Sequence, residues 1–190
     1  MKDAARAYRR LRRLSLSPQE LSDATDPEVG KRIGLPRDVS AGIPIFFCGG
    51  GQHVAAERSG PGIAGIDLLV VATAKPERAM GFYGARLGLP LVFDQVNSTN
   101  GSRLMQFQCG NMLIEVINRP GGDKDDRADR LWGVGWRVPD AEAVRERLVS
   151  AGLDVSDVKD GAKRGTRVFT IRNGTCNVPT LVVQHIGGPS

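Results

Sequence analysis

Residues 65–89, GIDLLVVATAKPERAMGFYGARLGL, decide the fold of this chain. The β-branched and aliphatic run at 66–72 predicts a buried strand. Pro76 and Glu77 then predict the first turn of a helix, where a missing amide hydrogen and a negative charge are both favourable. Apolar side chains recur at helical spacing as far as Leu87, and the glycine that follows is a typical helix stop. The stretch therefore predicts a strand followed by an amphipathic helix.

The order of elements that starts in this stretch is completed and then repeated. Three strand-like segments follow the helix, at 89–95, 103–109 and 112–117. The second unit has a strand at 131–138, a helix that begins after the N-cap residue Asp140, and strands at 153–158, 166–172 and 180–186. Two units of the order βαβββ predict an α+β protein built by internal duplication.

The first 60 residues are interpreted as a truncated third unit, with a helix and the last strands but no opening strand. The alternative interpretation is a terminal extension whose similarity to the modules is coincidental. A truncated unit is expected to pack on the paired modules or on a partner chain. The predicted boundaries are an N-terminal extension at 1–48, a Gly-rich linker at 49–65, module 1 at 66–119, a polar linker at 120–130 and module 2 at 131–188.

Charge is concentrated at the N-terminus. The chain has 26 Lys and Arg against 21 Asp and Glu, and residues 1–13 hold six of the basic residues and one acidic residue. The other 177 residues therefore carry 20 charges of each sign, which argues against a nucleic-acid partner. The basic helix alone leaves two alternatives, a solvated surface or a contact with an acidic partner or nucleic acid.

Several classes of protein are excluded by what the sequence lacks. No apolar run reaches the roughly 18–20 residues of a membrane span, so no membrane partner is expected. The N-terminus lacks the apolar stretch of a secretory signal. The three cysteines form no CxxC or CxxH pair, which favours free thiols in a reducing compartment. We therefore predict a cytoplasmic protein.

The stretch 82–89, with Phe-Tyr, three further residues and Leu-Gly-Leu, resembles the opening of a vicinal oxygen chelate module. Arg137-Val138-Pro139-Asp140 before an Ala-containing helix is similar to the start of a second one. That superfamily includes glyoxalase I, extradiol dioxygenases, methylmalonyl-CoA epimerase and bleomycin-resistance proteins. The resemblance covers both units, and it implies paired modules that form a curled mixed sheet around one cavity.

The resemblance also implies where a metal would be held. In metal-using members one side chain on each of four strands points into the cavity, and the matching positions here are Leu68, Glu115, Gly133 and Gln184. Only Glu115 is a strong ligand, whereas such sites normally use three or more protein donors. The expected cofactor is therefore none, or a weakly held divalent metal with Glu115 and His185 as candidate ligands.

Strand alternation gives Glu115 a role independently of the resemblance. Residues 113, 115 and 117 share one face of their strand, so the carboxyl group lies in an apolar stripe. A carboxyl group there needs a partner or a raised pKa, and Arg137 is the candidate partner. We predict Glu115 as the catalytic or ligand-binding group; the alternative is a strand-end carboxylate that meets water.

Other candidate residues follow from the same alternation. Gln106 and Gln108 give one strand a polar face that either lines the cavity or meets solvent. Trp132 and Trp136 are expected to pack under the helix that follows Asp140, and the alternative is that they stack on a substrate. His185 is expected to face away from the cavity, unless the register is shifted by one residue. A further histidine, at position 53, falls in the Gly-rich linker and is expected on the surface.

Three functions remain open. The first is binding of a small organic ligand in the cavity, with Leu68, Gln106, Gln108, Glu115, Gly133, Arg137 and Gln184 around it and with a degraded metal site. The second is a metal-dependent lyase, isomerase or dioxygenase that combines Glu115 with donors from His185, His53 or a partner subunit. The third is an interaction module that uses the basic helix. A homodimeric or pseudo-dimeric protein with a small-molecule ligand is the expectation.

Overall fold

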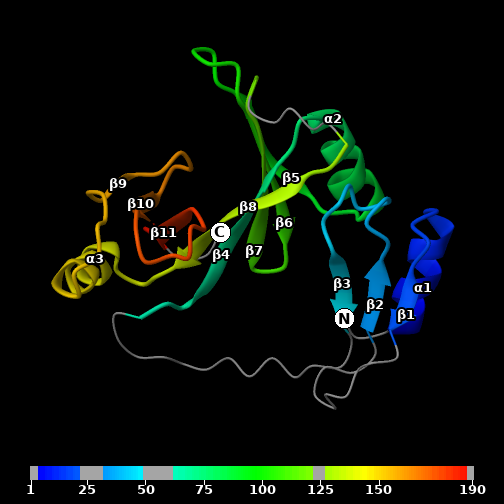
Figure 1. Ribbon diagram of the computed structural model, residues 1–190, viewed down its shortest axis with the longest axis horizontal. Coiled ribbons are helices and arrows are strands. Elements are labelled where there is room, and N and C mark those ends of the chain that lie inside the picture. Colours follow the sequence, from blue (N-terminus) through cyan, green and yellow to red (C-terminus); the bar gives the residue numbers. More distant parts are fainter. Residues whose placement is uncertain (1–3, 22–31, 49–61, 122–126, 188–190) are drawn as a thin grey trace.

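The computed structural model describes residues 4–21, 32–48, 62–121 and 127–187 of the chain. An eight-stranded mixed sheet runs through the structure in the order β5-β6-β7-β4-β8-β11-β10-β9 (Figure 1). Its strands are β4 (Gly65–Ala72), β5 (Leu91–Val96), β6 (Arg103–Cys109), β7 (Met112–Asn118), β8 (Arg130–Arg137), β9 (Lys159–Asp160), β10 (Thr166–Ile171) and β11 (Thr180–His185).

The pairing of the strands shows two modules of the same topology. In module 1 the first strand β4 lies parallel to the last strand β7, and in module 2 β8 lies parallel to β11. The two first strands, β4 and β8, pair antiparallel and join the modules into one sheet. The prediction of an α+β protein with paired βαβββ modules in a strongly curled mixed sheet is confirmed.

The helix of module 1 changes its winding within the stretch that decides the fold. Helix α2 (Pro76–Ala79) begins at the predicted proline and continues as a π-helix, η1 (Met80–Arg86). The wider winding is visible in the backbone hydrogen bond from Leu87 N to Phe82 O, 2.9 Å long. Phe82 and Tyr83 are both buried, with their rings edge to face at 5.1 Å, so adjacent residues enter the core together.

Helix α3 (Ala141–Ser150) of module 2 begins as predicted after Asp140. The Asp140 carboxylate accepts a hydrogen bond from Ala143 N at 3.1 Å, which satisfies one of the free amides of the first turn. Ala141 and Val144 are buried beneath the helix.

Loss of this cap should have a modest and local effect. Asp140→Ala is expected to lower the free energy of unfolding by about 1 kcal/mol, because the first-turn amide loses its acceptor. Glu146→Ala, which alters an exposed residue in the same helix, is expected to stay within about 0.5 kcal/mol of the parent. Urea denaturation followed by circular dichroism measures both, and equal effects would contradict the capping role.

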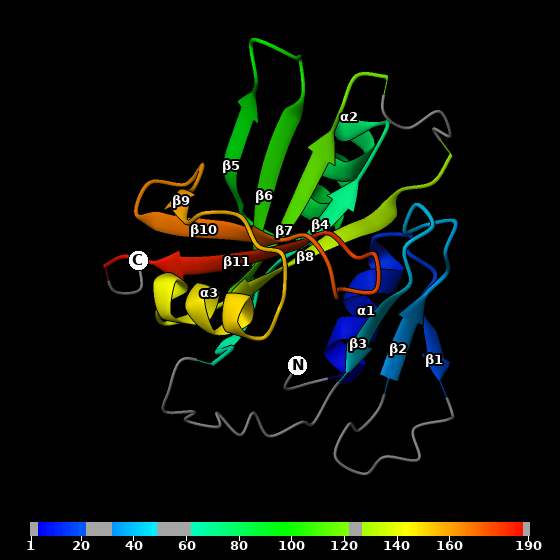
Figure 2. The same cartoon turned by 60° about the vertical axis from the view of Figure 1, so that its left-hand side comes forward.

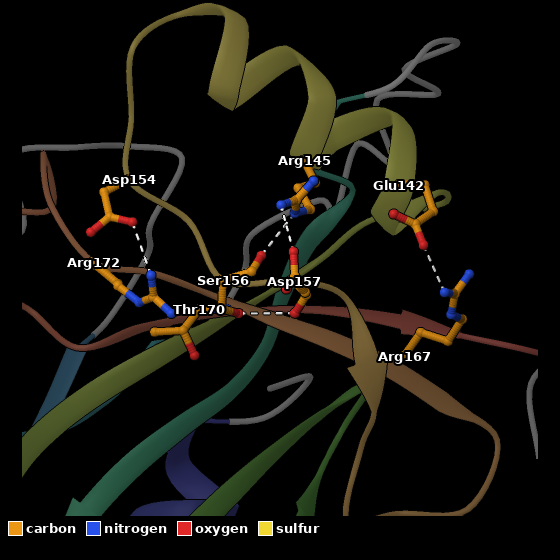
Figure 3. Close-up of polar contacts among 8 residues, drawn as sticks. All are labelled: Glu142, Arg145, Asp154, Ser156, Asp157, Arg167, Thr170 and Arg172. Atoms are coloured by element: carbon orange, nitrogen blue, oxygen red, sulfur yellow. Dashed lines mark hydrogen bonds and ion pairs between the residues drawn. The ribbon is translucent and has the colours of Figure 1, made fainter.

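The predicted strand at 153–158 is wrong. Only Val155 forms an isolated bridge, with Ile171, and the edge strand β9 lies further along the chain. Figure 3 shows the reason: the Ser156 hydroxyl accepts the hydrogen bond of Thr170 N at 3.0 Å, in place of a backbone carbonyl. Arg145 also binds this segment, through Ser156 O and the Asp157 carboxylate. Two backbone hydrogen bonds, from Ser156 N to Thr170 O and from Arg172 N to Asp154 O, hold the segment together with these side chains.

The N-terminal extension forms a helix and a small antiparallel sheet. Helix α1 (Ala4–Arg13) is followed by β1 (Gln19–Leu21), β2 (Arg32–Leu35) and β3 (Ile45–Cys48), in the order β1-β2-β3. Both figures place this unit beside helix α2 of module 1 (Figures 1 and 2). Its origin as a truncated module stays a prediction, as do the domain boundaries, and residues 49–61 and 122–126 of the two linkers lie outside the described residues.

One hydrophobic cluster joins the extension to module 1. Leu11, Leu16 and Ile33 pack with Phe82 and Phe107, and all five are buried. The Arg10 guanidinium also donates to Leu87 O and lies against Gly88, where it leaves no room for a Cβ. The extension therefore covers the helix-bearing side of module 1. Within the described residues, no helix is long and apolar enough to cross a membrane.

Candidate functional site

The sheet has a second face, which points away from helices α2 and α3 and is called the inner face below. Leu68 and Val70 of β4 pack there with Leu113 of β7, and all three are buried. Ile117 and Trp132 pack against them. The register places Val70 opposite Glu115 on β7 and opposite Gly133 on β8, so this face crosses the junction of the two modules.

Glu115 is the carboxyl group in the middle of this apolar surface. Its Oε2 accepts a hydrogen bond of 2.8 Å from Nε2 of Gln106, the buried residue directly opposite on β6. Burial raises the pKa of Glu115, and the hydrogen bond from Gln106 offsets part of that rise. The pair can accept or donate hydrogen bonds, and a carboxyl group with a raised pKa can also transfer a proton.

Gln108 and Arg137 do not contact Glu115. The Gln108 amide donates to Gly110 O and Met112 O, and so closes the turn between β6 and β7. The expected ion pair between Glu115 and Arg137 is wrong. Arg137 pairs instead with Asp67, with Nε 2.8 Å from Oδ1, and its Nη2 donates to Asn111 O.

Asp67 is a buried acid that the sequence did not single out. Its side chain is 4 % exposed, and its Oδ1 also lies 2.7 Å from His185 Nε2. A register shift between Ile66 and Leu68 makes Asp67 the extra residue of a β-bulge in β4. Bulges redirect side chains, and this one turns an acid to its partners on β8 and β11. The cluster of Asp67, Arg137 and His185 thus joins both modules near the start of β4.

Gln184 and His185 occupy the faces opposite to those predicted. The Gln184 Oε1 accepts a hydrogen bond of 3.0 Å from Ala141 N, at the start of helix α3, so its side chain lies on the helix side of the sheet. His185 therefore lies on the inner face, where it meets Asp67. The free amide at the helix N-terminus explains the difference, because it provides a donor for the glutamine oxygen.

The four positions that match metal ligands do not form a metal site. The Leu68 side chain lies over Gly135, where a Cβ would come within 2.7 Å of it. A side chain at position 133 would collide with Pro179 O, which lies 2.7 Å from the position of an ideal Cβ at Gly133. Glu115 is left as the single ligand, and no group of three His, Cys, Asp or Glu side chains in the described ranges could hold an ion. Among the residues that the structure describes, these four positions do not fit a divalent metal.

Trp132 is turned to the inner face, so its predicted position under helix α3 is wrong. β4 and β8 change register between Val70 and Val71, which pair with Gly133 and Leu131, and Trp132 is the extra residue. It packs on the apolar cluster of the inner face, and the Arg119 guanidinium lies over its ring, 4.4 Å from the centroid. Bulges are not visible in strand alternation, so the alternation did not place Trp132 here. Arg119 continues the alternation of 113, 115 and 117, which is the signal that could have placed it on this face.

The contributions of Leu68, Gln106, Gln108, Glu115, Gly133, Arg137 and Gln184 to ligand binding stay predictions, as does catalysis by Glu115. His53, the remaining candidate metal donor, lies outside the described residues. Of the predicted set, the structure brings Glu115 and Gln106 together, with Leu68 on the same face. Arg137 and His185 meet at Asp67, and Gln184 lies apart from both groups.

Comparisons with known proteins agree on the fold. A family model described as Glyoxalase/Bleomycin resistance protein/Dioxygenase superfamily matches residues 65–175. Methylmalonyl-CoA epimerase from Mycobacterium tuberculosis is a similar solved structure, with 21% identity and a TM-score of 0.60 over 71% of this chain and 97% of that one. No curated protein matches the chain.

Two further solved structures are similar, with sequence identities below 20% and TM-scores above 0.5. A Streptomyces coelicolor methylmalonyl-CoA epimerase variant, in complex with 2-nitronate-propionyl-CoA, has 18% identity and a TM-score of 0.56 over 67% of this chain and 100% of that one. A hypothetical protein from Bacillus halodurans C-125 has 16% identity and a TM-score of 0.54 over 66% and 96%. These likenesses show a shared fold.

Proposed function

Because the chain belongs to the Glyoxalase/Bleomycin resistance protein/Dioxygenase superfamily, we propose that it binds a small organic molecule on the inner face without a resident divalent metal. The observation that carries this proposal is the Glu115–Gln106 pair within an apolar surface. Ligand sites are mostly apolar surfaces with a few placed polar groups, which is the composition found here.

The residues at the four positions that match metal ligands differ from those of metal-using members, which supports the proposal that no divalent metal is resident. Leu68 and Gly133 supply no donor atom from a side chain, and Gln184 is bound to the start of helix α3. Among the described residues, His185 supplies an imidazole on the inner face, and its Nε2 is bound to Asp67. A metal-dependent lyase or dioxygenase would need further donors from His53 or from a partner subunit.

A second candidate function is acid–base catalysis by Glu115. Burial raises the pKa of this carboxyl group, which brings it closer to the range in which a group both gives and takes a proton near neutrality. Such a group suits an isomerase or lyase that moves a proton on a bound organic molecule. A homodimer in the cytoplasm is also part of the proposal, and light scattering on the purified protein measures the oligomeric state.

Metal analysis tests the proposal directly. The purified protein is expected to carry no stoichiometric divalent metal and to show no change of Tm with Mn²⁺, Ni²⁺, Zn²⁺ or Fe²⁺. An ion at one hundred times its Kd would add about 2.7 kcal/mol to the free energy of unfolding and raise the Tm by roughly 5–10 °C. Stoichiometric metal that stabilises the protein would contradict the metal-free proposal.

A thermal-shift screen of small organic molecules gives the matching positive test. Molecules that raise the Tm of the parent should raise that of Glu115→Gln less. Glu142→Gln is the matched control, because Glu142 lies on helix α3, where it is 49 % exposed and paired with Arg167 on the outer surface (Figure 3). Shifts that are equal in all three proteins would place the ligand away from the inner face.

A further inference from the structure

One cation on the inner face has a geometry that the proposed function does not use. Residue 119 follows β7 directly and continues the alternation of 113, 115 and 117, so Arg119 belongs to the same face as Glu115. Its guanidinium covers the ring of Trp132, which the bulge in β8 turns to this face. Two separate features, strand alternation and a bulge, therefore bring a cation and an aromatic ring together.

Stacking on an aromatic ring leaves the hydrogen-bonding edge of a guanidinium free. The cation–π contact uses the flat face of the group, whereas its five N–H donors lie in the plane. Within the described residues, the Arg119 side chain has no carboxylate partner, and it is exposed. A planar fork held in place in this way matches the two oxygens of a carboxylate or phosphate.

The position of Arg119 relative to Glu115 limits the shape of the ligand. Four residues of extended chain separate them, so their Cα atoms are about 13 Å apart at roughly 3.3 Å per residue. The space between is apolar, because Ile117 lies on the same face between them and is partly buried, and the buried Val70 lies beside Glu115 on β4. A molecule that reaches from the guanidinium to Glu115 needs an apolar or aromatic body between its polar ends.

We propose that Arg119, held on the ring of Trp132, binds an oxyanion, and that the ligand of the inner face is an organic acid with a carboxylate or phosphate at one end and an apolar body. This inference rests on the proposed function, because it names the chemical class of the ligand. The alternative is that Arg119 only shields the indole ring from water, in which case the charge of the ligand has no influence on affinity.

Two dyes with the same ring system test the proposal. Anilinonaphthalene sulfonate carries an oxyanion, whereas N-phenylnaphthylamine is its neutral counterpart. In a Trp136→Phe background Trp132 is the one tryptophan left, because the chain has two. Energy transfer from Trp132 then reports dye bound near the inner face. The preference for the anionic dye is expected to fall roughly tenfold in Arg119→Gln, as a charge-assisted hydrogen bond is lost.

The matched control is Arg86→Gln, which makes the same change of charge at an exposed residue of the helix-bearing side. It should leave the preference unchanged, and displacement of the dye by benzoate or by phenyl phosphate then identifies the preferred oxyanion. If both dyes accept energy from Trp132 and Arg119→Gln does not alter their ratio, the oxyanion site is wrong while ligand binding on this face stands. If neither dye accepts energy from Trp132, the oxyanion site and the proposed function both fall.

Discussion

Replacing Asp129 with alanine is expected to lower the free energy of unfolding by about 3 kcal/mol, because it leaves a buried network without its acceptor. The Asp129 side chain is 2 % exposed, and its Oδ1 lies 2.6 Å from Arg78 Nη2. The same atom accepts a hydrogen bond of 2.6 Å from the Thr73 hydroxyl. Arg78 is 30 % exposed and can recover some hydration, so we expect the lower part of the range for a broken buried pair.

Asp129 connects three parts of the chain, so its loss is expected to affect all three. Its backbone N–H donates to Ala41 O of the N-terminal extension at 2.7 Å. Arg78 belongs to helix α2, and Asp129 itself directly precedes β8. The pKa of Tyr83 is raised by burial and, to a smaller extent, by the charge of Asp129. The carboxylate therefore links the extension, module 1 and the start of module 2.

Asp154→Ala is the matched control for this prediction. Asp154 pairs with Arg172 at 3.0 Å, and Figure 3 shows this pair, but both side chains are 56 % exposed. Such pairs contribute roughly 0–1 kcal/mol. Urea denaturation followed by circular dichroism compares the two variants. Equal losses would mean that Asp129 is no more than a surface charge.

The buried position of Asp129 and its contacts were not predicted from the sequence. It lies in the polar segment 120–130, whose composition predicts a solvated linker. Its partners Thr73 and Arg78 are more than 50 residues away, and neither contact leaves a trace in local composition. In contrast, the stretch 65–89 predicts its strand and helix from local pattern alone, and the repeat then predicts the paired modules. Local signals thus gave the architecture, and long-range polar contacts remained invisible.

The candidate site was predictable to the extent that strand alternation holds. Glu115 and Gln106 lie opposite each other because β6 and β7 are regular throughout their pairing. β4 and β8 contain two register shifts, and these redirect Asp67 and Trp132. A bulge depends on how two strands fit together, so one strand's sequence does not reveal it. The largest errors therefore occur at the strand pair that joins the modules.

Glu115→Gln is expected to become more stable than the parent as the pH rises, which is the opposite of what loss of a useful contact would give. Burial raises the pKa of Glu115 in the folded protein, so the folded state binds its proton more tightly than the unfolded state. The parent therefore loses stability as the pH increases from the ordinary glutamate range through the raised value. Glutamine carries no charge and avoids this loss.

The difference between the two proteins has a defined pH dependence. Below the ordinary pKa of glutamate, about 4.3, the carboxyl group is protonated in both states, and the difference should be constant. Between that value and the raised one it should change by up to about 1.4 kcal/mol per pH unit, in favour of Glu115→Gln. Urea denaturation at a series of pH values measures it. A difference that does not vary with pH would show that Glu115 is not desolvated.

Gln106 gives an internal control, because its hydrogen bond lowers the pKa of Glu115 and so offsets part of the effect of burial. Gln106→Leu should therefore extend the pH-dependent loss of stability to higher pH. In the double variant with Glu115→Gln this extension should vanish, since no proton is left to bind. The charge of Glu115 is thus expected to lower the free energy of unfolding at neutral pH, so the fold does not need this carboxyl group. The presence of Glu115 at the centre of an apolar surface therefore supports the proposed role of that surface in ligand binding.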